Sequence, residues 1–266
     1  MHAYEYTFVR NKVMSLTGID LNYYQSPGVQ RRLNTYLRRS SHSNWYNFFC
    51  AISNDPTRLV KFKDYLTRNV SSFFQDTEAF EYLQKSILPK LVRTGSPHHL
   101  NLRVWSVGCT HGYDPYSLAI ILAEVTGFYR RHYILATDVD HSAIEYARAG
   151  GPYSAKEVAK IPPHLLECYF NHRSNPIRDG DGYYVTEELR HRVTFRHQNL
   201  PTVPSESRFD IIICRDTVIH FAAEIKNRHA LRPGGILFVD NDIATVISRS
   251  IDEFETVNTS LYRHKE

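Results

Sequence analysis

Residues 103–140 carry the pattern that most restricts the fold: an apolar strand, a turn bounded by glycines, a helix, and a second apolar strand that ends on acids. The turn runs from Gly108 to Gly112, and Asp138 follows the second strand. A strand that enters a helix through small residues lets backbone N–H groups approach a ligand, and an acid after the next strand can bind two ribose hydroxyls. The pattern therefore predicts a βαβ unit that forms half of a nucleoside-cofactor site.

The glycine spacing narrows the choice of cofactor. Gly108 and Gly112 are four residues apart, so the turn lacks the G-x-G-x-x-G spacing that places a pyrophosphate on a helix N-terminus. S-adenosylmethionine (SAM) has a ribose and an adenine but no pyrophosphate, and Asp114 at the expected helix start offers a carboxylate to its ammonium group. A βαβ unit whose glycines only serve packing and whose acids only cap helices remains the alternative. We expect the Asp138 carboxylate to serve the ligand and not the fold.

From residue 101 onward, apolar runs alternate with helical patterns. Runs at 193–197, 210–214 and 235–239 have the character of buried parallel strands that are covered on both faces. The spacing between the second and third strands, about 55 residues, exceeds that of a simple crossover, and a turn-rich, β-branched stretch predicts a small inserted β-subdomain at about 170–192. The order predicts a doubly wound α/β sheet.

Residues 1–93 have apolar residues at helical spacing and no strand pattern. We expect helices at 4–17, 27–39, 44–53 and 56–67, followed by an amphipathic linker helix within 69–91. The chain is therefore expected to divide into a small all-helical N-terminal domain with its linker helix at 1–93 and a second domain at 94–266.

The expected helix at 27–39 concentrates positive charge. Arg31, Arg32, Arg38 and Arg39 lie off its apolar face. They form either a solvated surface or an electropositive face for an acidic partner. Nucleic acid is not expected as that partner, because no nucleic-acid motif accompanies the arginines.

The amino-acid composition limits the kinds of protein that this chain can be. The chain has 266 residues, of which 42% are hydrophobic, and this indicates a folded protein rather than a disordered one. No run approaches the roughly 18 apolar residues of a membrane span, and charges interrupt residues 1–20 in a way that no signal peptide shows. A soluble, cytoplasmic protein without membrane insertion is expected. The four cysteines lie far apart and the histidines lack metal-binding spacing, so neither disulfides nor a metal site is expected.

Eight segments extend in order over nearly the whole chain: NVSSFF, ILPKL, VWSVGCTHGYDPYSLA, ATDVD, PPHLLECYF, FRHQNL, FDIIICRDTVIHF and LRPGGILFV. In order and spacing they resemble the chemotaxis-receptor glutamate methyltransferases known as the CheR family. The resemblance implies a class I methyltransferase (Rossmann-like) sheet that uses SAM, releases S-adenosyl-L-homocysteine, and forms methyl esters on glutamate side chains. It further implies that the helical domain docks its arginines on the cytoplasmic methylation helices of chemoreceptors.

The resemblance also implies roles for single residues. Those expected to bind the cofactor are Asn69, Ser71, Gly108, Gly112, Asp114, Asp138, Asn199, Leu200, Cys214 and Arg215. Gln75 and His220 stand where the family has a substrate-orienting arginine and a tyrosine, and they are the expected catalytic residues. Asp216 stands where the family has an asparagine.

These substitutions leave three functions open. The first is an active glutamate methyltransferase, because a glutamate carboxylate is already ionised at pH 7 and Gln75 still donates hydrogen bonds, without the charged fork of an arginine. The second is a SAM-binding member with weak or no transferase activity that acts as a regulatory or binding module. The third is a methyltransferase for an acceptor that is not ionised, with His220 as its general base.

Overall fold

The computed structural model describes residues 3–19, 21, 27–67, 72–94, 101–174, 181–198, 208–215, 230–239 and 253–265. These residues form two compact units. One is built from the helices of residues 3–67, and the other from the described residues between 72 and 265. The region expected to form a linker helix belongs to the second unit. It consists of α5 (Thr77–Tyr82), the π-helical turn η2 (Leu83–Ile87) and α6 (Leu88–Thr94).

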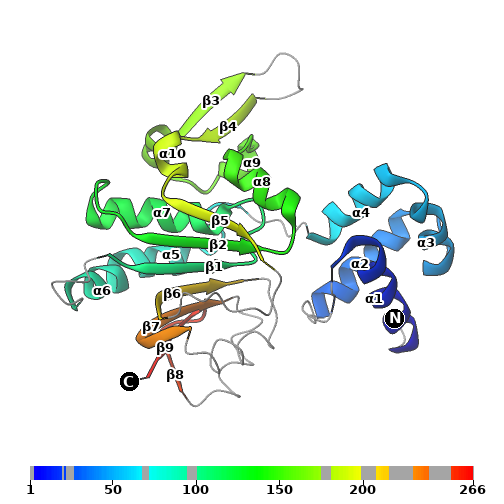
Figure 1. The fold of residues 1–266 in the computed structure, drawn as a ribbon, viewed down its shortest axis with the longest axis horizontal. Coiled ribbons are helices and arrows are strands. Elements are labelled where there is room, and N and C mark those ends of the chain that lie inside the picture. Colours follow the sequence, from blue (N-terminus) through cyan, green and yellow to red (C-terminus); the bar gives the residue numbers. More distant parts are fainter. Residues whose placement is uncertain are drawn as a thin grey trace. The chain divides into compact units, whose positions relative to one another are not determined.

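The first unit contains four helices within its described residues (Figure 1). They are α1 (Ala3–Thr17), α2 (Pro27–Arg39), α3 (Trp45–Ser53) and α4 (Pro56–Thr67). Asn44 caps α3 by accepting the N–H of Asn47 at 2.9 Å, so α3 begins one residue later than the apolar spacing predicts. Aromatic side chains fill the core, where Trp45 stacks on Phe49 with ring centroids 5.5 Å apart.

The second unit is organised around a seven-stranded sheet with the order β5-β2-β1-β6-β7-β9-β8. Its strands are β1 (Arg103–Val107), β2 (Tyr133–Asp138), β5 (Val193–His197), β6 (Phe209–Cys214), β7 (Leu231–Val239), β8 (Phe254–Thr256) and β9 (Leu261–His264). The pairs from β5 to β7 are parallel, whereas β9 pairs antiparallel with both β7 and β8. The doubly wound α/β sheet is confirmed, and the antiparallel β8–β9 hairpin extends it.

Helix α7 (Tyr113–Thr126) follows β1 and is buried on nearly all sides from Tyr113 to Ala123. It packs between the sheet and other helices, including α6 and α11 (Glu187–Arg190). A helix covered all round has no need of a polar face, which explains the unbroken apolar run from Leu118 to Ala123. Figure 1 shows α7 lying along the strands, with its N-terminal turn next to the end of β1.

The stretch between β2 and β5 contains α8 (His141–Ala149), α9 (Ala155–Val158) and α10 (Pro163–Tyr169). After α10, β3 (Phe170–Ser174) and β4 (Asp181–Val185) form a separate antiparallel hairpin, which is the small inserted β-subdomain expected from the sequence. Among the described helices of both units, none has the length and apolarity required to cross a bilayer.

Candidate functional site

Three adjacent parallel strands, β2, β1 and β6, end at the same edge of the sheet. From β1 the chain adds β2 and β5 on one side, whereas β6 and β7 lie on the other side. The strand order therefore reverses between β1 and β6. Ligands of open α/β sheets bind beyond the carboxyl ends of the strands at such a reversal.

The turn after β1 has an unusual backbone. Gly108, Thr110 and Gly112 have φ angles of 64°, 45° and 89°, and a β-branched residue such as Thr110 rarely adopts a positive φ. A Cβ at Gly112 would lie 3.0 Å from a ring carbon of Tyr116, so the close approach of helix and turn requires glycine there. The N–H of Gly112 donates to the carbonyl of Cys109 at 2.8 Å. The turn is thus tightly closed upon itself.

Asp138, at the end of β2, holds the turn in place. Its Oδ2 accepts the N–H of Thr110 at 2.8 Å, and its Oδ1 accepts the N–H of Asp140 at 2.8 Å. The residue is only 6% exposed. Burial raises the pKa of the Asp138 carboxyl, against the opposing effect of these two N–H donors. The expectation that this carboxylate serves only a ligand is wrong, because it also supports the strained Thr110 backbone.

Asp138 nevertheless retains the capacity to bind a ribose. A carboxylate has about four lone-pair positions, and the N–H groups of Thr110 and Asp140 occupy one on each oxygen, with a further backbone contribution from Val139. The remaining acceptor capacity can serve ribose hydroxyls.

Asp114 and Arg215 face each other across the point of reversal. Asp114 lies in the first turn of α7 after β1, and Arg215 directly follows β6. Arg215 Nε donates to Oδ2 of Asp114 at 2.9 Å and Nη2 donates to Oδ1 at 2.6 Å, which makes a bidentate ion pair. The Arg215 side chain is 5% exposed and that of Asp114 is 16% exposed. The pair presents opposite charges side by side at the edge where a ligand is expected.

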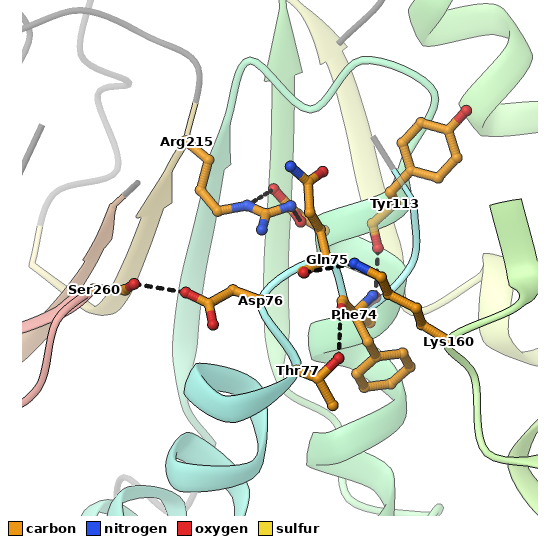
Figure 2. Close-up of polar contacts among 10 residues, drawn as sticks. Phe74, Gln75, Asp76, Thr77, Tyr113, Lys160, Arg215 and Ser260 are labelled. Carbon is orange, nitrogen blue, oxygen red and sulfur yellow. Dashed lines mark hydrogen bonds and ion pairs between the residues drawn. The ribbon is translucent and has the colours of Figure 1, made fainter. Parts of the chain in front are cut away.

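The loop before α5 reaches the same region (Figure 2). Phe74 has a positive φ of 51°, and its N–H donates to Oγ of Ser117 on α7 at 3.1 Å. Lys160 Nζ donates to the backbone carbonyl of Gln75 at 2.8 Å. Oε1 of Gln75 is buried and, within the described residues, has no hydrogen-bond partner. In the view of Figure 2 the Gln75 side chain extends from this carbonyl toward the guanidinium of Arg215.

Glu157 on α9 joins the loop to the start of α7. Its carboxylate accepts hydrogen bonds from the hydroxyl of Tyr113 and from N and Oγ of Ser154, and its backbone carbonyl accepts the N–H of Phe73 at 3.2 Å. Burial alone would raise the pKa of Glu157, but the hydrogen bonds from Ser154 and Tyr113 outweigh it and lower the pKa. The Phe73 ring is fully buried and packs edge-on against Tyr153, with centroids 4.8 Å apart.

The structure brings five of the residues expected from the sequence to one edge of the sheet: Gly108, Gly112, Asp114, Asp138 and Arg215. Cys214 is buried at the end of β6. Arg38 and Arg39 are exposed in the last turn of α2. Asn69, Ser71, Asn199, Leu200, Asp216 and His220 lie outside the described residues, as do the side chains of Arg31 and Arg32.

Three residues of this region were missed by the sequence patterns: Tyr113, Glu157 and Lys160. Only Glu157 had a readable signal, since Ser154 and Glu157 have the S-x-x-E spacing of a capping box. Its partner Tyr113 is 44 residues away, which no local pattern reveals. Within the described ranges, no three His, Cys, Asp or Glu side chains converge as a metal site would require.

The sequence of this chain is similar to those of known proteins. Residues 69–261 match the family described as CheR methyltransferase, SAM binding domain. A chemotaxis protein methyltransferase of Listeria innocua is 32% identical over 242 residues, which cover 88% of each chain. The corresponding protein of Borreliella burgdorferi is 30% identical and covers 80% of this chain and 76% of its own. Chemotaxis protein methyltransferase 2 of Pseudomonas aeruginosa is also 30% identical, with 86% and 82% covered.

Proposed function

This chain belongs to the CheR family of SAM-dependent methyltransferases of chemotaxis, and on that premise we propose that it forms methyl esters on glutamate side chains of chemoreceptors. The family match extends over residues 69–261 and so includes the whole edge of the sheet described above. The proposed product of the cofactor is S-adenosyl-L-homocysteine.

The described residues complement two parts of SAM, its amino acid end and its ribose. Its amino acid end carries an ammonium and a carboxylate, and the opposite charges of Asp114 and Arg215 complement these two groups. The remaining acceptor capacity of the Asp138 carboxylate complements the ribose hydroxyls. When bound, SAM supplies a methyl group on a sulfonium: an acceptor oxygen bonds to the methyl carbon as the carbon–sulfur bond breaks and its electron pair stays on sulfur.

The acceptor needs little chemical help from the protein. A glutamate carboxylate is ionised at pH 7, so no general base has to remove a proton. The contribution of the chain is to hold the acceptor in line with the methyl group and to keep water away. Gln75 contributes a neutral amide to this task, and its buried Oε1 lies in the loop that Lys160 and Ser117 fix.

Receptor docking is assigned to the helical unit. Arg38 and Arg39 are exposed at the C-terminal turn of α2, and the apolar residues Leu33 and Phe49 hold that unit together from within. We propose that the arginine face of α2, including Arg31 and Arg32, meets the acidic methylation helices of the receptor. Charges of opposite sign on two surfaces accelerate their encounter and fix their register.

The observation that carries the proposal is the Asp114–Arg215 pair at the reversal of strand order. The test is incubation of the purified chain with SAM, labelled in its methyl group, and receptor-containing membranes. Alkali treatment then releases labelled methanol if carboxyl methyl esters have formed. Asp138→Ala serves as the cofactor-binding control. SAM binding without any methanol release would refute the proposal and favour a regulatory SAM-binding role.

A further inference from the structure

Lys160 brings an ammonium group to the loop that carries Gln75. Its Nζ lies 2.8 Å from the Gln75 carbonyl oxygen, although the two residues are 85 positions apart in the sequence. Lys160 is exposed, and an ammonium has three N–H donors, of which the Gln75 carbonyl uses one. No other described residue engages the remaining donors, which can serve a ligand that approaches from solvent.

The position of this ammonium is fixed from its own segment. Lys160 follows α9 by two residues, and Glu157 on that helix binds the N–H of Phe73 and the hydroxyl of Tyr113. Phe73 is fully buried, so the loop and α9 share one packed contact. A lysine whose head group is already hydrogen-bonded, next to a helix that is packed in place, loses less freedom when it binds a ligand.

Among the described residues near Gln75, the charge of Lys160 has no ion-pair partner. Arg215 makes its bidentate pair with Asp114, and the side chain of Gln75 is neutral. Within the described residues, no carboxylate lies within ion-pair distance of Lys160. An acceptor carboxylate that enters beside Gln75 would therefore find its opposite charge at Lys160.

Building on the function proposed above, we propose that Lys160 binds the acceptor carboxylate and makes the site prefer an ionised glutamate to a neutral glutamine. Hydrogen bonds from a charged donor to a carboxylate are stronger than those to a neutral amide. The ester product carries no charge, so the same ammonium holds the product less tightly than the substrate. Lys160 would thus favour both selection of the acceptor and release of the product.

The test measures binding and does not depend on turnover. The protein, saturated with S-adenosyl-L-homocysteine, is titrated with a cytoplasmic receptor fragment that has either glutamate or glutamine at a single acceptor position. The wild type should bind the glutamate form about tenfold more tightly, the ratio expected for one charge-assisted hydrogen bond. Lys160→Gln, which can still donate to the Gln75 carbonyl, and Lys160→Met should both bind the two fragments equally. Lys160→Arg should retain the preference.

Lys156→Met is the matched control, because Lys156 is an exposed lysine on the same short helix. It should behave as the wild type does. The proposal is overturned if the wild type shows no preference, or if Lys160→Gln and Lys160→Met keep it. Failure of the wild type to release labelled methanol would instead count against the glutamate methyltransferase function. For an active enzyme, loss of the ammonium should raise KM for the receptor more than it lowers kcat, with the SAM dissociation constant unchanged.

Discussion

The hydroxyl of Ser260 donates a 2.6 Å hydrogen bond to Oδ2 of Asp76, across 184 positions of sequence (Figure 2). Ser260 is fully buried beside β9, and Asp76 is the residue after Gln75. The other carboxylate oxygen of Asp76 accepts the N–H of Ala79 and caps α5. One carboxylate therefore joins the β8–β9 hairpin to the loop that carries Gln75.

Ser260→Ala should lower the free energy of unfolding by about 1.5 to 3 kcal/mol, the usual contribution of a hydrogen bond to a charged group. Urea unfolding measures this change. Ser142→Ala, at an exposed position, should change the free energy by less than about 0.5 kcal/mol. Equal effects of the two substitutions would mean that the bond contributes nothing to stability.

Because Asp114 and Arg215 form an ion pair, the stability losses from substituting each of them should not add up in the double variant. Asp114→Leu leaves the buried guanidinium of Arg215 without its carboxylate partner and should destabilise the protein by about 3 to 5 kcal/mol. Adding Arg215→Met should recover much of that loss, because two apolar groups replace two charges. Urea unfolding of the single and double variants gives the coupling energy. Additive losses would show that the two side chains do not depend on each other. All variants should lose SAM affinity in titration calorimetry.

Asp138→Ala should weaken SAM binding by about 100-fold, since two ribose hydroxyls lose a charged acceptor. The same change should also lower the free energy of unfolding by about 1 to 3 kcal/mol, because the N–H groups of Thr110 and Asp140 lose theirs. Calorimetry with SAM and urea unfolding separate the two effects. A variant of unchanged SAM affinity would exclude Asp138 from the ribose site.

His132 predicts a loss of stability in mild acid. Burial, with the nearby charges of Arg130 and Arg192, lowers the pKa of His132 from 6.5 to about 4. Its Nδ1 accepts the N–H of Leu102 at 3.0 Å, which requires the neutral ring. Between pH 6.5 and 4 the unfolded chain binds more protons at this residue, so stability is complete above pH 6.5 and declines as the pH falls toward 4. His132→Gln should flatten this decline, whereas exposed His164→Gln should not. Identical pH profiles for all three proteins would contradict the assignment.

If the arginine face of α2 docks on the receptor, charge reversal there should impair receptor methylation and leave SAM binding intact. Replacing Arg31, Arg32, Arg38 and Arg39 by glutamate should leave SAM affinity unchanged and abolish methylation of receptor membranes. In the wild type, receptor binding should weaken as salt increases, because salt screens exposed charges. If the charge-reversed protein methylates receptors normally at physiological ionic strength, that face is merely solvated.

Local patterns were sufficient for the elements of the fold. The runs at 103–107 and 193–197 became β1 and β5 residue for residue. β1 is buried as expected, whereas β5 is an edge strand, and its exposed Thr194 and His197 contradict the expected cover on both faces. The β8–β9 hairpin went unnoticed because its strands are very short, three and four residues, and depend on pairing, β9 with β7 and β8 with β9. Tertiary context decides such strands more than their own sequence does.

The site was predictable only in part. Asp138 is the last residue of β2, Arg215 directly follows β6, and Asp114 lies in the first turn of the helix after β1, and strand ends can be located from sequence. The hydrogen-bond partners in the site could not be predicted, because the Asp114–Arg215 bond spans 101 positions and the Lys160–Gln75 bond spans 85. Such contacts depend on the register of the whole sheet and not on any local spacing. The structural role of Asp138 likewise appears only once Thr110 is seen in its strained conformation.

The antiparallel β9 has a consequence for synthesis on the ribosome. Among the described strands of the large sheet, β9 is the last to be translated, and it must pair with β7 before Ser260 can reach Asp76. The first unit, by contrast, is made of helices whose residues lie within 67 positions of one another, and contacts between near neighbours form fast. A nascent chain should thus carry a finished helical unit while the cofactor half still waits for its closing strand. Until that strand arrives, the emerging polypeptide has the helical unit, for which receptor docking is proposed, without a completed second unit.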